Sequence, residues 1–213
     1  MEKKLKLRPD TAIRINYNRI FKPLLRKYVK EGMDVLNIGA GKTTTYDKFF
    51  EGTNYETLDP RKSAKATYIM DVAREIPNKK YDVLILSNVL EHISEPILFF
   101  ENANKLLKPN GVMIIGVPFL YSHHPPGDYY RYTSEGLMHL LKAHFNSDCD
   151  CRIIPHGNPF LTFLRGIATI KYLGILFNLT SRLWEFIFRY TDVKSPSGYF
   201  LVVESTQWKT TQK

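Results

Sequence analysis

Residues 121–133 hold the densest group of side chains able to do acid–base chemistry in this sequence. Two histidines, His123 and His124, precede Asp128 and Arg131. Histidine is a general base near neutral pH, a carboxylate can orient it, and arginine can hold an acidic or phosphate group through two hydrogen bonds. Prolines and a glycine favour an exposed, irregular loop. The alternative is a proline-rich connector that ends where Thr133 caps the next helix.

A second stretch, residues 34–41, has the pattern of a strand that ends in a glycine turn. The apolar run passes into Asn37-Ile38-Gly39-Ala40-Gly41, and residues 43–50 are compatible with a helix. Glycines let backbone approach a ligand closely, and a helix start offers free N–H groups. Asp59 lies twenty residues after Gly39, where nucleotide-binding α/β units place the acid that binds ribose hydroxyls. A nucleotide-like ligand is favoured over a purely structural turn.

The elements that must position these residues follow from the apolar pattern. It predicts an amphipathic helix over 13–30, a helix that begins at Ser94-Glu95-Pro96, and a helix after Thr133. It also predicts seven strands, at 34–38, 54–58, 66–70, 81–86, 112–117, 149–154 and 199–203. We expect an α/β fold with a doubly wound, mostly parallel seven-stranded sheet and helices on both faces. The 121–133 loop would follow a strand at the carboxyl edge, where such folds bind ligands.

One domain is expected over 1–213, because the length would accommodate two only with difficulty. We divide it into a basic lead-in helix (1–31), a cofactor-binding core (32–157), an apolar helical insertion before the last strand (158–192), and the last strand with a tail (193–213).

Five motifs together resemble the class I S-adenosylmethionine-dependent methyltransferases, specifically their small-molecule, type 11-like branch. In order they are Asn37–Gly41 after a strand, Leu58-Asp59-Pro60, Asp71-Val72, Ser87-Asn88-Val89-Leu90-Glu91-His92-Ile93, and Leu107-Lys108-Pro109-Asn110-Gly111. The resemblance covers roughly residues 30–145. It implies a Rossmann-like fold and S-adenosylmethionine as the cofactor.

The resemblance also implies roles for individual residues. Gly39, Ala40 and Gly41 would lie against the methionine moiety, Asp59 with Pro60 would hold the ribose hydroxyls, and Asp71 with Val72 would meet the adenine. Ser87 and Asn88 would line the methyl-donor pocket, with His92 close by as a second candidate base. The family usually has Asp or Glu where this chain has Asn37, so the contact to the cofactor's amino group is expected to be weaker or of another kind.

Two related site types are disfavoured. Dinucleotide-binding dehydrogenases generally have a third glycine where this chain has Thr44. In some quinone-related methyltransferases a Glu-His pair joins another acid to hold a metal, but Asn88 stands at the position of that acid. We therefore predict no metal site, and a structural or substrate-contact role for Glu91 and His92.

Charge and composition limit the partners. The formal net charge is +9, and residues 1–32 hold ten Lys or Arg against three Asp or Glu. No nucleic-acid recognition module is recognisable, which disfavours nucleic acid. Residues 160–190 are apolar and aromatic, and we expect them to pack on the sheet or on a second subunit in a homodimer, or to contact a membrane surface peripherally. The absence of a signal peptide and the two cysteines favour a cytoplasmic protein, at most peripheral to the inner face of the membrane.

These features lead to a functional hypothesis. We expect O-methylation of a sugar or another small hydroxylated molecule in surface-glycan or lipid-linked biosynthesis, because the His-rich, Asp-x-x-Arg loop resembles a subgroup linked to bacterial surface polysaccharides. The alternatives are a quinone or lipid head-group methyltransferase, and a non-catalytic cofactor-binding scaffold, which Asn37 favours.

Overall fold

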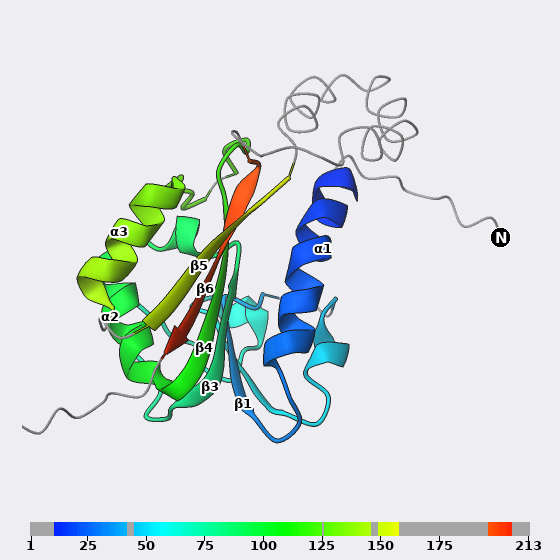
Figure 1. Ribbon diagram of the computed structural model, residues 1–213. Helices are drawn as coiled ribbons and strands as arrows, with labels where there is room; N and C mark the ends of the chain where they lie inside the picture. Colours follow the sequence, from blue (N-terminus) through cyan, green and yellow to red (C-terminus); the bar gives the residue numbers. More distant parts are fainter. Residues whose placement is uncertain (1–10, 42–44, 125, 146–148, 158–195, 206–213) are drawn as a thin grey trace, which may run out of the picture.

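A six-stranded mixed sheet organises the part of the chain that the structure, a computed structural model, describes: residues 11–41, 45–124, 126–145, 149–157 and 196–205. The spatial order is β2-β1-β3-β4-β6-β5 (Figure 1). The strands are β1 (Asp34–Ile38), β2 (Asn54–Leu58), β3 (Tyr81–Ser87), β4 (Leu107–Pro118), β5 (Cys149–His156) and β6 (Gly198–Ser205).

The chain winds outward in two directions from β1. Strands β2, β1, β3 and β4 are parallel, and β6 pairs antiparallel with both β4 and β5. The chain runs from β1 to β2 on one side and then to β3 on the other, which creates a topological switch point between β1 and β3. Ligands of open α/β sheets bind outside the carboxyl ends of the strands at such a point. The prediction of a mostly parallel, doubly wound sheet is confirmed.

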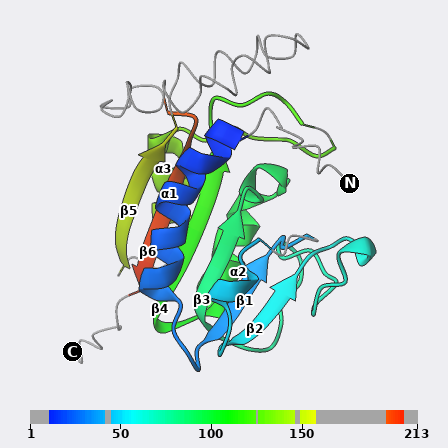
Figure 2. The same cartoon turned by 90° about the vertical axis from the view of Figure 1, so that its right-hand side faces the viewer.

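Helices cover both faces of this sheet. Helix α1 (Thr11–Tyr28) lies on one face, and α2 (Pro96–Leu106) with α3 (Ser134–His144) lies on the other (Figures 1 and 2). Alternate strand residues enter the two cores, because successive side chains in a strand point to opposite faces. Ile85, Ile114 and Phe200 pack under α1, whereas Leu84, Met113 and Leu201 pack on the side of α2 and α3.

The lead-in helix matches its predicted apolar stripe. Tyr17, Phe21, Leu24, Leu25 and Tyr28 are all buried, and their spacing puts them on one side of an α-helix. The helix carries Tyr17 across the sheet to the carboxyl ends of the strands, so it contributes to the site as well as to the core.

Two predicted elements differ from the structure. Residues 66–70 were predicted as a strand, yet they form only an isolated bridge between Tyr68 and Leu58. The Thr57 and Thr67 hydroxyls accept the backbone N–H groups that would extend this ladder, at 3.0 and 3.1 Å, and Ile69 is half exposed. Of the helix predicted over 43–50, the described part forms only a short 3-10 helix, η1 (Asp47–Phe49).

Several predictions lie outside the described residues. They are the helical insertion at 158–192, the membrane or subunit contact assigned to 160–190, and the first ten residues of the basic lead-in segment. Within the described ranges, no helix has the length and apolar character needed to cross a membrane.

An ion-pair cluster joins the amino ends of β1 and β3. The Asp34 carboxylate accepts from Lys108 Nζ at 2.6 Å and lies 3.1 Å from Lys79 Nζ, and Lys108 also donates to Asp82 at 2.8 Å. The hydrogen bond from Lys108 is the main cause that lowers the pKa of Asp34 to about 2. A carboxylate with a lowered pKa in the folded state stabilises the fold above its unfolded pKa and loses that effect as pH falls.

We therefore expect Asp34→Asn to cost about 1 kcal/mol of unfolding free energy at pH 6, allowing for solvent screening. The difference from the unmutated protein should shrink as pH falls below about 4, and it should vanish only below about 2, where Asp34 is protonated in both states. Urea unfolding at several pH values measures it, with the exposed Glu51→Gln as control. A difference that stays constant down to pH 2.5 would contradict the assignment.

Candidate active site

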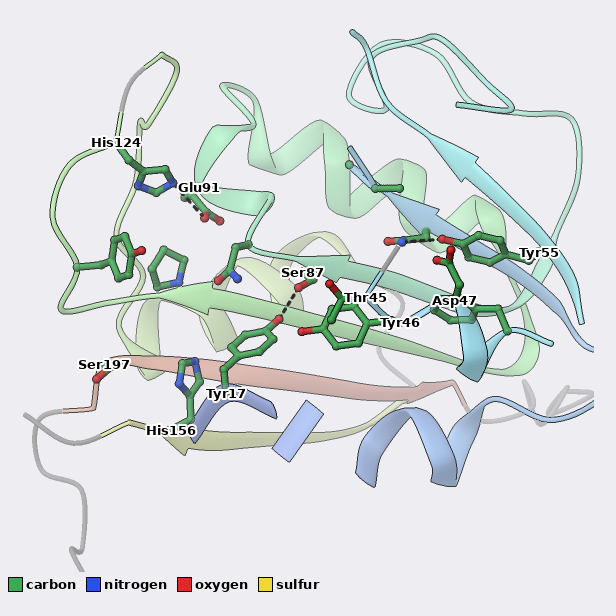
Figure 3. A pocket seen from close by; sticks show the side chains of 17 residues that line it. Tyr17, Thr45, Tyr46, Asp47, Tyr55, Ser87, Glu91, His124, His156 and Ser197 are labelled. Atoms are coloured by element: carbon green, nitrogen blue, oxygen red, sulfur yellow. Dashed lines mark hydrogen bonds and ion pairs between the residues drawn. The ribbon is translucent and has the colours of Figure 1, made fainter. Parts of the chain in front are cut away.

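A cavity of about 400 Å³ opens at the carboxyl edge of the sheet, beside the switch point (Figure 3). Figure 3 shows Asp47 and Tyr55 towards one end of it and His124 with Ser197 towards the other. Its lining comes from the strand ends, α1, the segment around η1 and the loop after β4: Tyr17, Asn37, Gly39, Ala40, Thr45, Tyr46, Asp47, Phe50, Tyr55, Ser87, Asn88, Glu91, Pro118, Tyr121, His124, His156 and Ser197.

The glycine turn after β1 forms part of this wall. Gly39 and Gly41 both have a left-handed backbone, with φ of +70° and +60°. A Cβ atom on Gly39 would overlap the Val89 side chain, so only glycine fits both the conformation and the space. Gly39 N–H donates to Leu58 O at 2.6 Å, which ties the turn to the end of β2.

Asp59 is fully buried just beyond that turn. Its carboxylate accepts from Gly41 N–H at 3.1 Å, from Arg61 Nε at 2.9 Å and from a terminal nitrogen of Arg61 at 2.8 Å. Burial alone would raise the pKa of Asp59, but the hydrogen bonds and charge of Arg61 outweigh it and the net pKa is lowered. The Arg61 side chain is 66% exposed, so it covers the carboxylate from the solvent side.

The end of β3 supplies polar groups to the middle of the cavity. Ser87 Oγ lies 2.6 Å from the Tyr17 hydroxyl (Figure 3). Asn88 N–H donates to Gly116 O at 2.8 Å. Asn88 has φ of +55°, a conformation that asparagine tolerates better than most residues. Nearby, Asn37 donates its side-chain N–H to the Tyr55 hydroxyl at 2.9 Å.

The loop after β4 brings one histidine into the cavity. Asp128 accepts from the His124 backbone N–H at 2.9 Å, and its Oδ2 lies 3.3 Å from His124 Nδ1. Arg131 donates hydrogen bonds from both terminal nitrogens to the Asp128 carboxylate, and these hold the pKa of that carboxyl well below its usual range. Arg131 is therefore engaged in bracing the loop, whereas His123 is exposed.

Glu91 lies beneath His124 and is fully buried. Burial raises its pKa to about 7. The backbone carbonyl of Glu91 accepts from Tyr129 N–H at 2.8 Å, which fastens the loop to η3 (Leu90–His92). His92 donates or accepts at both ring nitrogens, 2.9 Å from Gly127 O and 3.0 Å from His124 Nε2.

The cavity contains some of the predicted site residues and not others. Asn37, Gly39, Ala40, Ser87, Asn88 and His124 line it. Gly41 and Asp59 are joined to the lining through the turn. The remaining predicted residues do not line it: Pro60, Asp71, Val72, His92, His123, Asp128 and Arg131. Asp71 is exposed and accepts from Ala73 N–H, and Val72 is buried behind it. Their cofactor contacts stay predictions.

Sequence reasoning missed lining residues that carry no motif. Tyr17 had the apolar spacing of a core residue, and burial raises its pKa, so its hydroxyl stays protonated. His156 ends β5, is 5% exposed, and has no hydrogen-bond partner for either ring nitrogen among the described residues. Burial lowers its pKa to about 4, so it is neutral at physiological pH. A strand-final histidine was the one available signal.

Comparison with known proteins identifies the family. A family model described as a methyltransferase domain matches residues 11–146, more than half of the chain. The chain belongs to this methyltransferase family. This confirms the prediction that the chain is an enzyme of the class I S-adenosylmethionine-dependent methyltransferases. A search of curated protein sequences finds no match.

Solved methyltransferases share the fold. The Haemonchus contortus phosphoethanolamine N-methyltransferase 2 in complex with S-adenosyl-L-methionine aligns with a TM-score of 0.59 at 13% identity, covering 96% of this chain. The chain spans only 59% of the length of that structure. A SAM-dependent methyltransferase from Archaeoglobus fulgidus aligns with a TM-score of 0.57 at 14% identity, and the alignment covers 92% of this chain and 95% of that one. The plantazolicin methyltransferase BpumL in complex with S-adenosylhomocysteine aligns with a TM-score of 0.57 at 14% identity. That alignment covers 92% of this chain and 85% of BpumL.

The residues of this methyltransferase fit S-adenosylmethionine, the cofactor of its family. The cavity of about 400 Å³ lies within the roughly 300–1,000 Å³ of ligand pockets. Two small residues, Gly39 and Ala40, leave the backbone of the turn accessible at its wall. Next to the turn, the buried Asp59 carboxylate offers two acceptor oxygens once Arg61 is displaced.

Proposed function

We propose that this methyltransferase transfers the methyl group of S-adenosylmethionine to an oxygen of a sugar or another small hydroxylated molecule, within surface-glycan or lipid-linked biosynthesis. The observation that supports this most directly is the position of His124. Its side chain enters the same cavity as Gly39, Ala40 and Asn88, so a base and the proposed methyl-donor wall face one space.

Methyl transfer requires mainly that the acceptor atom and the methyl group of the cofactor be aligned. The cofactor, when bound, supplies a methyl carbon already activated by a positive sulfur, and the protein places the acceptor in line with it. His124 is positioned to take the acceptor's hydroxyl proton, and Asp128, held by Arg131, keeps the ring oriented. Ser87 and Tyr17 fix the polar floor of the cavity through their mutual hydrogen bond.

A second candidate acceptor is a lipid head-group amine. Four tyrosines and a phenylalanine line the cavity: Tyr17, Tyr46, Tyr55, Tyr121 and Phe50. Aromatic faces attract ammonium groups through cation–π interactions. The fold is also that of a phosphoethanolamine N-methyltransferase, although identity is only 13%. Quinone acceptors and a non-catalytic scaffold stay as further alternatives.

A methyl-transfer assay with isotopically labelled S-adenosylmethionine tests the proposal. The panel contains monosaccharides and nucleotide sugars, phosphoethanolamine, and hydroxylated quinone precursors. We expect label in a sugar-type acceptor, with the new bond to oxygen located by mass spectrometry. Label only in the amine would favour the head-group candidate. Tight cofactor binding with no transfer to any acceptor would favour the scaffold.

Three further properties of the whole protein are proposed. They are a cytoplasmic location, a peripheral membrane contact through residues 160–190, and a homodimer. Nucleic acid is not proposed as a partner.

A further inference from the structure

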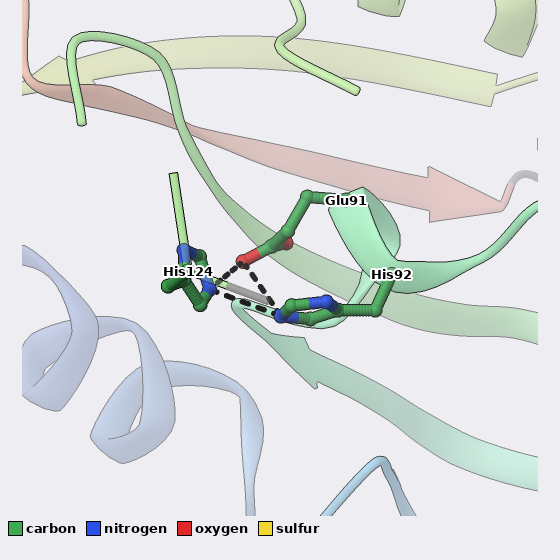
Figure 4. A group of neighbouring side chains, drawn as sticks. All are labelled: Glu91, His92 and His124. Carbon is green, nitrogen blue, oxygen red and sulfur yellow. Dashed lines mark hydrogen bonds and ion pairs between the residues drawn. The ribbon is translucent and has the colours of Figure 1, made fainter. Parts of the chain in front are cut away.

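Three ligand-type atoms converge at the edge of the cavity. They are Glu91 Oε1 and His92 Nε2, from η3, and His124 Nε2, from the loop after β4 (Figure 4). His92 Nε2 lies 3.0 Å from His124 Nε2, and each of these nitrogens lies 3.9 Å from Glu91 Oε1. Figure 4 shows the Glu91 carboxylate and the imidazole rings of His92 and His124 pointing towards one another.

The carboxylate in this group lacks partners. Glu91 is fully buried, and neither of its oxygens has a hydrogen-bond partner among the residues that the structure describes. A buried polar group without a hydrogen-bond partner destabilises the fold, and an ionised one destabilises it more. A cation between the three atoms would remove that destabilisation.

The surroundings of the two histidines leave lone pairs facing each other. Gly127 O lies 2.9 Å from His92 Nδ1, and a carbonyl only accepts, so Nδ1 carries the proton and Nε2 is a lone pair. His124 Nδ1 makes no hydrogen bond among the described residues, but it lies 3.3 Å from the Asp128 carboxylate, whose negative charge favours a proton there and a lone pair at Nε2. Such outer contacts are typical of metal-bound histidines.

The spacing matches a coordination sphere. Three atoms separated in this way share a point about 2.1 Å from each, and zinc bonds to histidine nitrogen and carboxylate oxygen are about 2.0–2.2 Å long. We propose that Glu91, His92 and His124 bind a divalent transition-metal ion, with zinc favoured. Two imidazoles and one carboxylate suit zinc or a neighbouring transition metal better than magnesium, which prefers oxygen ligands.

The metal would reach the acceptor side of the cavity. Glu91 and His124 both line the cavity, so the open coordination positions face it. On the proposed function, an acceptor hydroxyl would bind there, and the metal would lower its pKa. Because His124 Nε2 would then hold the metal, the proton leaves to solvent and not to His124; the oxygen–methyl bond forms as the carbon–sulfur bond breaks, and a neutral thioether departs. Metal binding itself does not depend on this step.

The test measures metal on the untagged, full-length chain. After treatment with a chelator, the protein is titrated with Zn²⁺ and separately with Mg²⁺, and the bound metal is counted by mass spectrometry after gel filtration. We expect about one Zn²⁺ per chain and no retained Mg²⁺. Glu91→Gln, His92→Ala and His124→Ala should each weaken Zn²⁺ binding at least tenfold, whereas His139→Ala, exposed on α3, should not.

Two further measurements distinguish a lost metal site from a misfolded variant. Zn²⁺ should raise the melting temperature of the unmutated protein but not that of folded ligand variants, as judged by circular dichroism. Co²⁺ in place of Zn²⁺ should give visible absorption bands that the variants lose. Retention of Zn²⁺ in all three variants, or no Zn²⁺ on the unmutated chain, would overturn the proposal. Because S-adenosylmethionine binding and methyl transfer are separate assays, metal bound to an inactive protein would count against the proposed function alone.

Discussion

Asp59→Ala is expected to weaken S-adenosylmethionine binding at least about a hundredfold, or about 2.7 kcal/mol. Hydrogen bonds to a charged group contribute about 1.5–3 kcal/mol each, and on the predicted contact the ribose would offer two hydroxyls to this carboxylate. The substitution also removes the acceptor of Gly41 N–H, which helps to hold the glycine turn. Isothermal titration calorimetry measures the affinity, and thermal melting shows whether the variant is folded.

Arg61→Ala is the matched control. In the structure the Arg61 guanidinium donates to both oxygens of Asp59, so it would compete with the predicted ribose hydroxyls for them. Its removal should leave the affinity unchanged or make it tighter. If Arg61→Ala weakens binding as much as Asp59→Ala does, then Asp59 serves to hold Arg61, and the predicted ribose contact is wrong.

His124→Ala is expected to lower the turnover number at least about a hundredfold while leaving cofactor affinity within a factor of about three. A positioned general base contributes about 10²–10⁴ to a rate, and a lost metal ligand at this position would have a comparable effect. The rate is measured with the acceptor that the panel identifies, and the affinity by calorimetry.

The variant His123→Ala distinguishes the two loop histidines, which the sequence alone left as equivalent candidate bases. His123 is exposed and does not line the cavity, so His123→Ala should change turnover by less than about threefold. A large loss in His123→Ala with a normal rate in His124→Ala would reverse the assignment. Equal, normal rates in both would remove the loop histidines from the reaction.

Much of the frame could be predicted because it depends on local patterns. Periodicity located α1 and the buried strands, and the glycine turn located the carboxyl edge of β1. The strand predicted at 66–70 shows the limit of that method. Its residues favour a strand, but the two threonine hydroxyls satisfy the backbone groups that a further ladder would need.

The candidate site was less predictable, because its contacts join distant segments. His92 and His124 are 32 residues apart, and long-range hydrogen bonds such as Tyr129 N–H to Glu91 O and His92 Nδ1 to Gly127 O hold the loop over η3. The third ligand-type side chain was sought at position 88, next to the Glu-His pair, and the structure supplies it from another loop. Arg61, two residues from Asp59, carried no motif to indicate that it would cover that carboxylate.

His156 and Ser197, which line the cavity, stand on either side of the segment that leaves after β5 and rejoins at β6. Ser197 N–H donates to His156 O at 2.9 Å, so the two attachment points are already joined without that segment. Replacing residues 158–195 would therefore leave these two cavity-lining residues joined to each other.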